Sequence, residues 1–415
     1  MTAAGAQAVL RAIHGQVERL VAERRVDEAV ELYDRVLAVR PDDPEVLVAK
    51  GSVLLLGDDT PRAQRHFEAL TRLHPRMEDA WHGLGKALHD QHLCDQAIAV
   101  FTHAATLTAT PGRALYHRGM SYLLAGRFAE GWRDYEHRFA VPQLNPRRFS
   151  HPRWDGQALG GRRLLVICEQ GYGDVFQFAR FLPQLRGLGG TVVFECPMEL
   201  HALLAPLLDG FEVVPLRGRG PPDVPFDCYT ALMSLPFHLG IDLQDLDPTP
   251  GYLGIRHAPP PLRETLRIGV CWAGSPNHPE DLHRSMMPEW LAPLAADPRV
   301  HLVSLQKTAP RWAPLPGLSG FLHDPPAPLT DFTTTARLIA SLDAVVTVDT
   351  AIAHLAGAIG CPVWLLLSRA SEWRWLIGRS DSPWYATTHL TRQHTLGDWR
   401  GPVEQVRNDI ARIGR

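Results

Sequence analysis

Residues 348–362 place an acid, a hydroxyl and a histidine at a predicted strand-to-helix corner. A β-branched run over residues 345–348 predicts a buried parallel strand, and apolar residues at helical spacing follow it at once. The strand ends on Asp349 and Thr350, and His354 comes shortly after them. A helix that begins there directs free N–H groups and the positive end of its dipole above the strand, which suits a phosphate. The pattern therefore predicts a binding corner for an anionic ligand.

This corner resembles the nucleotide-sugar-binding corner of the heptosyltransferase-like glycosyltransferases of family nine. The family pattern runs Asp-Thr-Gly/Ala, two residues, His-Leu, small residues and Gly-x-Pro, and the chain follows it with Ala351 in place of the commoner glycine. The resemblance spans residues 161–415 and implies a GT-B fold and a nucleotide-sugar substrate. No Asp-x-Asp metal motif stands out, so we expect no metal and no cofactor. We expect Asp349 to bind sugar hydroxyls or orient the loop, and Thr350, Ala351 and His354 to contact the phosphates. A core histidine bonded to a carbonyl is the alternative for His354.

A second corner follows the first predicted strand of this part of the chain, in the sequence Glu169-Gln170-Gly171-Tyr172-Gly173-Asp174. Its glycines permit a tight turn and close approach to the backbone, and a helix N-cap is the local interpretation of Asp174. In the resembling enzymes a Gly-Asp at this corner supplies the carboxylate proposed as catalytic base. The resemblance therefore implies that Asp174 takes the proton as an acceptor oxygen attacks the anomeric carbon. Secondary candidates here are Glu169, Gly173 and Gln177.

A third group follows the predicted strand at residues 266–272. A small-residue turn with Gly274 and Ser275 leads into a polar loop that ends on Arg284. A fixed cation and oriented N–H groups stabilise the charge that grows on a diphosphate leaving group, and arginine can grip phosphate with two parallel hydrogen bonds. Heptosyltransferases usually carry a lysine in this loop, so Arg284 leaves the donor sugar open. Further candidates for the cleft are His278, Gln306 and Lys307.

The sequence Glu372-Trp373-Arg374-Trp375 and the aromatic residues after it resemble the tail of a bacterial subgroup that couples tetratricopeptide repeats to this fold. Aromatic side chains beside arginine can stack on a sugar or a base. Such clusters more often lock a C-terminal segment to its lobe, and we interpret this one as structural.

The first third of the chain repeats itself every 34 residues, the period of the tetratricopeptide repeat. In that helix–turn–helix unit a small residue allows two helices to approach and an aromatic residue fills the gap between them. The repeating positions are Ala29, Ala63, Ala97 and Gly131, then Tyr33, Phe67, Phe101 and Tyr135, then Gly51, Gly85 and Gly119. We predict about four repeats stacked into a solenoid that binds a protein or peptide. The alternative is a solenoid that only packs against the rest of the chain.

Changes in composition divide the chain into an α-solenoid and an α/β part with two Rossmann-like lobes. The predicted domains are residues 1–140 (repeats), 141–160 (linker), 161–258 (N-lobe, on the acceptor side) and 262–415 (C-lobe, on the nucleotide-sugar side). Strand–helix alternation in both lobes predicts parallel sheets. The predicted strands are residues 163–168, 191–196, 266–272, 300–305, 344–348 and 363–367, and the predicted helices are residues 174–188, 198–208, 288–296, 333–341, 352–359 and 403–413.

The composition is that of a soluble globular protein. Its 415 residues are 45% apolar and 21% charged, with a formal net charge of −3 and no basic block that would indicate nucleic acid. No apolar run is long enough for a transmembrane segment, and no secretory signal begins the sequence, so we expect a cytoplasmic location. Six scattered cysteines without a Cys-x-x-Cys pair argue against a zinc site and against a disulfide framework.

The favoured hypothesis is an inverting, metal-independent glycosyltransferase of the hexosyl or heptosyl type. A nucleotide-sugar donor would bind the C-lobe, and the repeats would recruit a protein or peptide acceptor. The alternative is a non-catalytic repeat scaffold with a degenerate transferase domain, against which the joint presence of Asp174, Arg284 and His354 argues. A nicotinamide-dependent enzyme is remote, because the Gly-x-Gly-x-x-Gly turn after a strand is missing.

Overall fold

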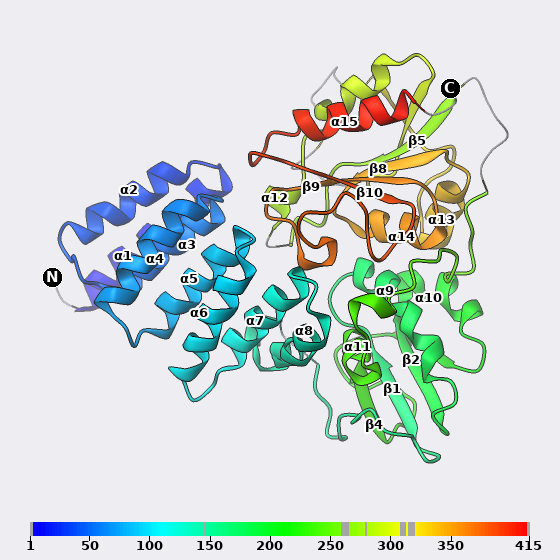
Figure 1. Cartoon of the computed structure of the whole chain (residues 1–415), viewed down its shortest axis with the longest axis horizontal. Coiled ribbons are helices and arrows are strands. Elements are labelled where there is room, and N and C mark those ends of the chain that lie inside the picture. The colour runs from blue at the N-terminus through cyan, green and yellow to red at the C-terminus, as the bar shows by residue number, and fades with distance from the viewer. Residues whose placement is uncertain are drawn as a thin grey trace. The chain divides into compact units, whose positions relative to one another are not determined.

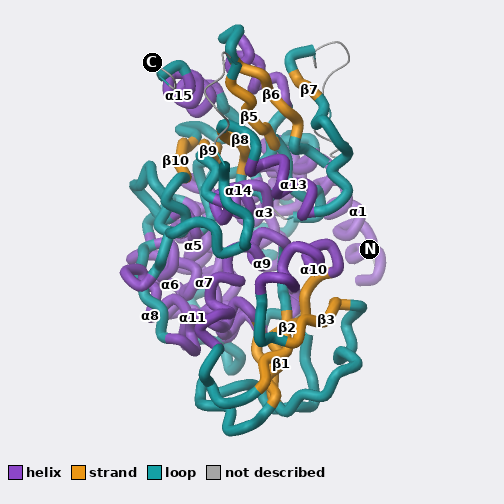
Figure 2. Tube along the Cα trace, turned by 90° about the vertical axis from the view of Figure 1, so that its right-hand side faces the viewer, coloured by secondary structure: helices purple, strands orange, loops and turns teal. Residues whose placement is uncertain are grey.

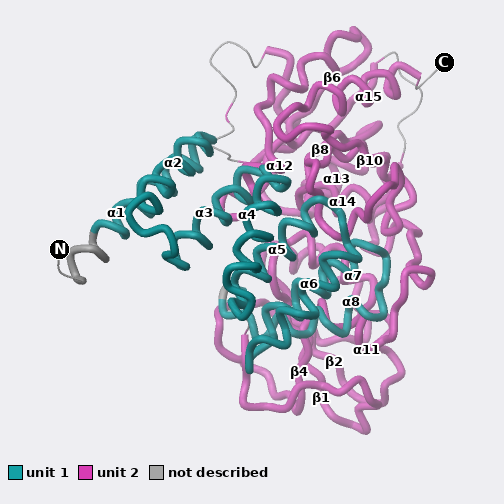
Figure 3. The backbone as a smooth tube through the Cα atoms, turned by 60° about the vertical axis from the view of Figure 1, so that its left-hand side comes forward, with its two compact units in different colours: residues 1–145 teal, residues 146–415 magenta. Residues whose placement is uncertain are grey.

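The chain divides into two compact units in the computed structural model. Unit 1 is Met1–Asn145 and unit 2 is Pro146–Arg415 (Figure 3). The structure describes residues 3–144, 147–258, 265–278, 280–307, 313 and 320–412.

Unit 1 consists of α-helices that each pack on the next along the chain (Figure 1). The first helices of the successive pairs are α1 (Ala3–Ala22), α3 (Pro44–Leu56), α5 (Glu78–Asp90) and α7 (Gly112–Leu124). Their partners are α2 (Val26–Leu37), α4 (Thr60–Leu73), α6 (Cys94–Thr106) and α8 (Phe128–Tyr135), followed by the 3-10 turns η1 (Glu136–Ala140) and η2 (Pro142–Leu144). This order of helix pairs confirms the predicted tetratricopeptide solenoid.

Glycines that face the aromatic position explain the repeat period. A Cβ atom on Gly85 would lie 2.6 Å from the ring of Phe101, and one on Gly119 would lie 2.7 Å from the backbone nitrogen of Tyr135. Phe101 is fully buried. The missing side chain in the first helix of a pair thus makes room for the second helix. This is why the glycine position and the aromatic position both recur every 34 residues.

The N-lobe of unit 2 contains a parallel sheet with the strand order β3-β2-β1-β4 in the part of the lobe that the structure describes. These strands are β1 (Arg163–Ile167), β2 (Thr191–Pro197), β3 (Glu212–Leu216) and β4 (Cys228–Ala231). The helical segments are α9 (Tyr172–Phe178), η3 (Ala179–Leu185), α10 (Met198–Leu204), η4 (Ala205–Leu207), η5 (Leu232–Ser234), α11 (Leu235–Leu239) and η6 (Leu243–Asp245). All strand pairs are parallel, as strand–helix alternation predicts.

The C-lobe contains a second parallel sheet, which lies apart from the first (Figure 2), with the described order β10-β9-β8-β5-β6-β7. From the first strand of the lobe outwards, this is the doubly wound order of a Rossmann fold. The strands are β5 (Leu266–Cys271), β6 (Val300–Ser304), β7 (Leu322–His323), β8 (Ala344–Val348), β9 (Val363–Leu367) and β10 (Thr388–Arg392). The helical segments are α12 (Asp281–Arg284), η7 (Pro288–Ala296), α13 (Phe332–Ala340), α14 (Ala351–Ile359), η9 (Trp373–Trp375) and α15 (Arg400–Ile410).

Proline shortens some of the predicted helices. In place of the predicted helix at residues 174–188, α9 ends at Phe178 and is followed by the 3-10 segment η3, which ends at Leu185 and has Pro183 inside it. Residues 288–296 are a 3-10 segment with Pro293 inside it. Proline lacks the N–H for an α-helical hydrogen bond, and its ring clashes with the preceding turn. The predicted helix at residues 198–208 is likewise divided: its first part is the α-helix α10, and its second part is the 3-10 segment η4.

Some strands have no counterpart among the predicted ones, namely β3, β4, β7 and β10. β4 and β7 are shorter than β8, β3 is only half-buried and contains Pro215, and β10 includes polar residues, so none shows the continuous buried β-branched pattern of β8. The predicted terminal helix is α15, which begins and ends earlier than predicted, and residue 413 lies outside the described residues.

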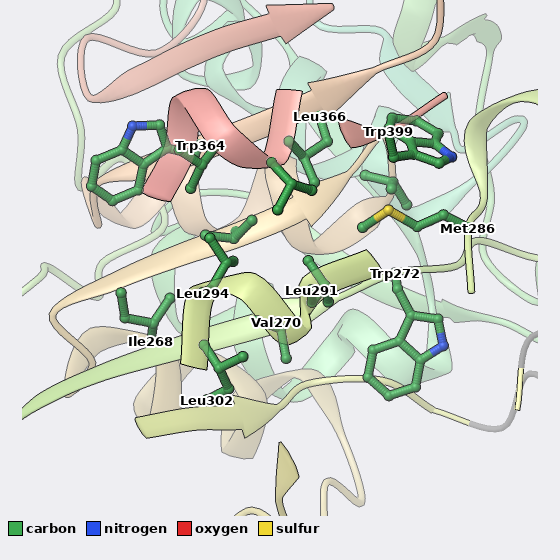
Figure 4. Packing of buried hydrophobic residues seen from close by; sticks show 14 of the residues in the cluster. Ile268, Val270, Trp272, Met286, Leu291, Leu294, Leu302, Trp364, Leu366 and Trp399 are labelled. Carbon is green, nitrogen blue, oxygen red and sulfur yellow. The ribbon is translucent and has the colours of Figure 1, made fainter. Parts of the chain in front are cut away.

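The core of the C-lobe covers one face of the second sheet (Figure 4). Apolar residues of β5, β6, β8 and β9 pack there with residues of η7 and α15. Trp272, Trp364 and Trp399 belong to this core and are nearly or fully buried. The core holds the carboxyl ends of β5 and β8 in fixed places, and both candidate loops of the C-lobe begin at those ends.

All six cysteines are buried free thiols, and burial raises the pKa of each. Within the described ranges, no group of three or more His, Cys, Asp or Glu side chains could hold a metal ion. None of the helices that the structure describes combines the length and apolar character needed to cross a bilayer.

Candidate active site

The Asp349 corner lies where β8 meets α14. Thr350 is the N-cap of α14, and its Oγ1 accepts a hydrogen bond of 3.2 Å from the Ile352 N–H. The same hydroxyl lies 3.2 Å from Thr347 Oγ1, so it is engaged inside the corner. Thr350 and Ala351 can therefore offer a ligand mainly backbone N–H groups at the helix start. Their phosphate contact remains a prediction.

His354 is a buried and neutral histidine at the centre of the site. Its Nδ1 shares a hydrogen bond of 2.9 Å with the Tyr385 hydroxyl, and its ring stacks on Trp375 with 5.3 Å between centroids. Burial, with a smaller effect of the Arg374 charge, holds the pKa of His354 well below its ordinary value. At neutral pH the imidazole can thus exchange hydrogen bonds but brings no positive charge. Its partner is a tyrosine hydroxyl rather than the carbonyl of the alternative interpretation.

The Gly173 corner of the N-lobe lies directly against His354. A Cβ atom on Gly173 would be 2.8 Å from Cδ2 of His354 and 3.6 Å from Cα of Ala351. The first turns of α9 and α14 therefore meet, and these helices pack on each other. This contact brings together the two corners that the sequence singles out.

Asp174 lies in the first turn of α9 and uses both carboxylate oxygens. Oδ2 accepts a hydrogen bond of 2.8 Å from the Gly171 N–H, which supports the helix start although Gly171, not Asp174, is the N-cap. Oδ1 forms an ion pair with Arg374 of the C-lobe. Burial raises the pKa of Asp174, while the Arg374 charge lowers it and the Glu372 charge raises it. The side chain keeps 15% of its surface exposed, so its free lone pairs can be reached.

Asp349 is tied to the same C-terminal segment. Its Oδ2 accepts a hydrogen bond of 2.8 Å from Nε1 of Trp375, and its Oδ1 lies 4.0 Å from Nε2 of His354. Burial and then the Glu372 charge raise the pKa of Asp349 to about 6, against a lowering by Arg284. A bound anion would favour its protonated form further, because like charges disfavour ionisation.

Arg284 supplies a positive charge that acts on Asp349. Its guanidinium lies over Gly274, where a Cβ atom would be 2.8 Å from Cζ. Ser285 holds the turn, since its Oγ accepts from the Gly274 N–H at 3.0 Å and donates to Asp281 Oδ1 at 2.7 Å. Among the described residues, Nε of Arg284 is buried without a hydrogen-bond partner. An unpaired buried donor on a cation indicates a place for an anion.

Gln306 and Gln177 have structural partners. Oε1 of Gln306 accepts from the N–H groups of Trp272 and Ala273 at 3.1 and 2.9 Å, and its Nε2 donates to the Ala273 carbonyl at 3.1 Å. Its amide therefore fixes the loop after β5, and the predicted ribose contact remains untested. Gln177 is fully buried, and its Oε1 accepts from Nε of Arg374 at 2.7 Å.

The remaining candidates are exposed or half-buried. Ser275, His278 and Lys307 are exposed, and Glu169 is half-buried. Oγ of Ser275 accepts from the Asn277 N–H at 3.4 Å, and Nδ1 of His278 accepts from the Glu280 N–H at 3.1 Å, so both shape their own loop. The structure thus groups Gly173, Asp174, Asp349, His354 and Arg284.

The C-terminal cluster contributes to the site in a way that was not predicted from the sequence. Arg374 and Trp375 bind the two aspartates of the site, and Tyr385 binds His354. One signal was available. An arginine between two tryptophans has to find an acidic partner if it is buried, and the Gly-Asp corner carries an acid in need of a cation.

Helical repeats followed by two Rossmann-like lobes define a tetratricopeptide-repeat protein with a GT-B transferase fold. Comparison with known families agrees with that class. Residues 14–63 and 56–113 match the tetratricopeptide repeat, and residues 326–377 match glycosyltransferase family 9 (heptosyltransferase). The latter segment contains Asp349, His354 and Arg374. The chain thus carries tetratricopeptide repeats at its N-terminus and a family 9 glycosyltransferase domain near its C-terminus.

Relatives include Protein FlbA of Caulobacter vibrioides, which is 27% identical over 433 aligned positions covering 92% of this chain and 69% of that protein. Two solved structures resemble the repeat region. A thermophilic tetratricopeptide-repeat protein of Thermus thermophilus has 22% identity and a TM-score of 0.29, over 32% of this chain and 75% of that one. MamA of strain AMB-1 has 25% identity and a TM-score of 0.26, over 30% and 73% of the respective chains.

Proposed function

We propose that this glycosyltransferase is inverting and moves a sugar from a nucleotide-sugar donor in the C-lobe to an acceptor, with Asp174 as catalytic base. The observation that carries the proposal is the contact between the two corners. Gly173 lies against His354 and Ala351, so the Asp174 carboxylate stands beside the first turn of α14. Arg284, with its unpaired Nε, adds a cation whose charge acts on Asp349 of the same group.

In the proposed step, the acceptor oxygen attacks the anomeric carbon and its proton passes to a free lone pair of Asp174. The bond between that carbon and the diphosphate oxygen breaks, and the nucleoside diphosphate leaves with the electron pair. Arg284 and the backbone N–H groups at the start of α14 stabilise the charge that grows on the leaving group. His354 and Asp349 provide hydrogen bonds for hydroxyls or phosphate oxygens. The proposed chemistry uses no metal and no cofactor.

We further propose that the acceptor is a protein or peptide that the repeats recruit. Tetratricopeptide solenoids present an extended surface for such partners, and this chain joins one to a transferase domain. The donor sugar would be of the hexosyl or heptosyl type. The competing hypothesis, a non-catalytic scaffold, predicts that nucleotides leave the protein unaffected.

The first test is binding of ADP, GDP and UDP, measured as a shift in the thermal unfolding of the full chain. We expect at least one of them to stabilise the protein, because a ligand that binds only the folded state raises its stability. Arg284→Ala should abolish the shift. Arg337→Ala is the matched control, since it removes an exposed arginine from α13 and should keep the shift. No shift with any nucleotide at millimolar concentration would favour the scaffold.

The second test separates binding from chemistry. Asp174→Asn should keep the nucleotide shift but lower transfer by about 100-fold or more, as loss of a general base does. Transfer is followed as nucleoside-diphosphate release from the matching nucleotide-sugar, with lysate of cells lacking the gene as the source of unmodified acceptor. Full activity of Asp174→Asn would move the base elsewhere, with Glu169 as the next candidate. Mass spectrometry of proteins from cells with and without the gene names the sugar class from the mass difference.

A further inference from the structure

We propose that Arg374 is a positioning residue for Asp174, whose carboxylate it holds in the orientation in which that group takes the acceptor proton. The inference rests on the proposed function, since it takes Asp174 as the base. It assigns a role in the reaction to a residue of the C-terminal cluster that sequence analysis interprets as structural.

The guanidinium of Arg374 is bound on all sides. One terminal nitrogen pairs with Asp174, the other pairs with Glu372, and Nε donates to Oε1 of Gln177 at 2.7 Å. Asp174 and Gln177 lie three positions apart on one face of α9. Arg374 therefore binds the N-lobe helix at two points one turn apart, and its planar shape permits only a narrow range of orientations. Its side chain is 3% exposed.

The segment that carries Arg374 is itself held. Cζ of Arg374 lies 4.3 Å from the ring centre of Trp373. The backbone carbonyl of Arg374 accepts a hydrogen bond of 2.9 Å from Nε1 of Trp384. Leu376, two residues later, has φ +50° and ψ 179°, a conformation that residues other than glycine rarely adopt. Such strain persists only where the surroundings impose it, so the path of this segment is fixed by its neighbours.

Arg392 of β10 imposes that path. It donates to the carbonyls of Trp375 and Leu376 at 2.8 and 2.9 Å and also to that of Arg379. Burial lowers the pKa of Arg392 to about 10, and its hydrogen bonds go to carbonyl and hydroxyl oxygens of this one segment. A buried cation thus fixes the shape of the loop that presents Arg374.

For Asp174 the result is a carboxylate held through both of its oxygens. Arg374 binds Oδ1 and the Gly171 N–H binds Oδ2, which leaves the remaining lone pairs in fixed directions. A base that is already oriented loses less entropy on the way to the transition state. The other charges that face Asp174 are Glu372 and Glu169, which both favour protonation. Arg374 is the charge that favours the ionised form, and the hydrogen bond from the Gly171 N–H acts in the same direction.

A second arginine, Arg180, also links the two lobes and packs on Tyr385. Arg180 donates to the carbonyl of Trp384 at 2.9 Å, to that of Gln177 at 2.9 Å and to the Tyr252 hydroxyl at 3.1 Å. No carboxylate stands among these partners, and none of them is Asp174. Because Arg180 links the same two lobes, it provides a matched control for the loss of a buried interlobe arginine.

The experiment compares the full chain with Arg374→Gln, Arg374→Lys, Arg180→Lys and Asp174→Asn between pH 5 and 8, using the nucleoside-diphosphate release assay. Arg374→Gln should lower turnover at pH 7 by about 10- to 100-fold and move the acid limb of the rate profile to higher pH by about one unit. The thermal shift with the nucleoside diphosphate should stay. Arg374→Lys keeps the charge, so its acid limb should stay near the wild-type position while turnover remains reduced. Arg180→Lys should lower the unfolding temperature without moving the limb.

Two results would overturn the inference alone. One is wild-type turnover and an unmoved limb in Arg374→Gln while Asp174→Asn is inactive. The other is a limb that moves equally in Arg180→Lys, since that would trace the shift to the packing of the lobes. Full activity of Asp174→Asn would instead remove the proposed base, and the role of Arg374 with it. The lysine variant keeps the test valid if the glutamine variant does not fold.

Discussion

Acid should weaken the repeat unit through a pair of histidines between α5 and α7. Nδ1 of His117 lies 2.9 Å from the Arg113 carbonyl and 3.1 Å from Nε2 of His82. A carbonyl only accepts, so His117 Nδ1 carries the proton and His82 Nε2 has to be the unprotonated acceptor. Protonation of His82 would place two N–H groups face to face. The pair is therefore built for neutral rings.

The magnitude follows from the pKa of His117, which burial lowers from 6.5 to about 4. Because the folded state disfavours the charged ring, this contribution to stability is complete above pH 6.5 and is lost as the pH falls towards 4. Linkage gives a loss of at most about 2 kcal/mol at pH 5 and about 3 kcal/mol at pH 4 for one such group. Burial also lowers the pKa of His82 well below its usual value, so this histidine too should reduce the stability of the repeat unit in acid.

The assay is urea unfolding of the full chain at pH 7 and pH 5, with pulsed hydrogen–deuterium labelling read on peptides from α5 and α7. With a slope of about 2 kcal/mol per molar urea, the midpoint for these helices should fall by up to about 1 M. His117→Gln should lose much of this acid sensitivity, whereas His103→Gln, at an exposed position, should retain it. Equal midpoint changes in the wild type and His117→Gln would refute the reasoning.

Two glycine pairs give further tests. Gly85→Ala should destabilise the repeat unit by about 1–3 kcal/mol through overpacking against Phe101. Gly15→Ala, with open space around its Cβ, should stabilise α1 by up to about 1 kcal/mol. Urea midpoints of unit 1 measure both changes, and an unchanged midpoint in Gly85→Ala would contradict the packing argument. Gly173→Ala should push α9 away from His354 and lower nucleoside-diphosphate release, whereas Gly171→Ala, with only an ordinary 3.5 Å contact to Asp174 and φ −93°, should be tolerated. Equal activity of these two variants would show that the contact of α9 with His354 does not matter.

The repeat unit was predictable because its determinants are local and recur. Each glycine and its aromatic partner lie within one helix pair, as Gly85 and Phe101 do, so their spacing alone indicates the contact. The central strands were predictable for a related reason, since β8 is buried on both faces and reads as a continuous β-branched run. The ends of the helices were harder to predict, because Pro183 and Pro293 change the hydrogen-bond pattern within segments that otherwise have apolar residues at helical spacing.

The site was predictable only in part. Parallel strands explain why the loops after β1, β5 and β8 carry its residues. The pairing of Asp174 with Arg374 could not be read from periodicity, because the two residues lie 200 positions apart, and the only signal was the arginine between two tryptophans. Gln306 carries a second role that its position did not indicate. Its place at the end of a strand predicts a ribose contact, which stays a prediction, and its amide also binds the backbone of the neighbouring loop.

The six buried thiols leave the surface without native sites for maleimide dyes. A cysteine introduced at Val39 in unit 1, which is 82% exposed, and another at Met198 in the N-lobe, which is 60% exposed, would be the accessible targets. A fluorophore pair at these positions would report, by energy transfer in single molecules, how far apart the repeats and the N-lobe stand and whether that separation changes when acceptor and donor arrive. Because the native cysteines are all buried, such labelling would not require their prior replacement.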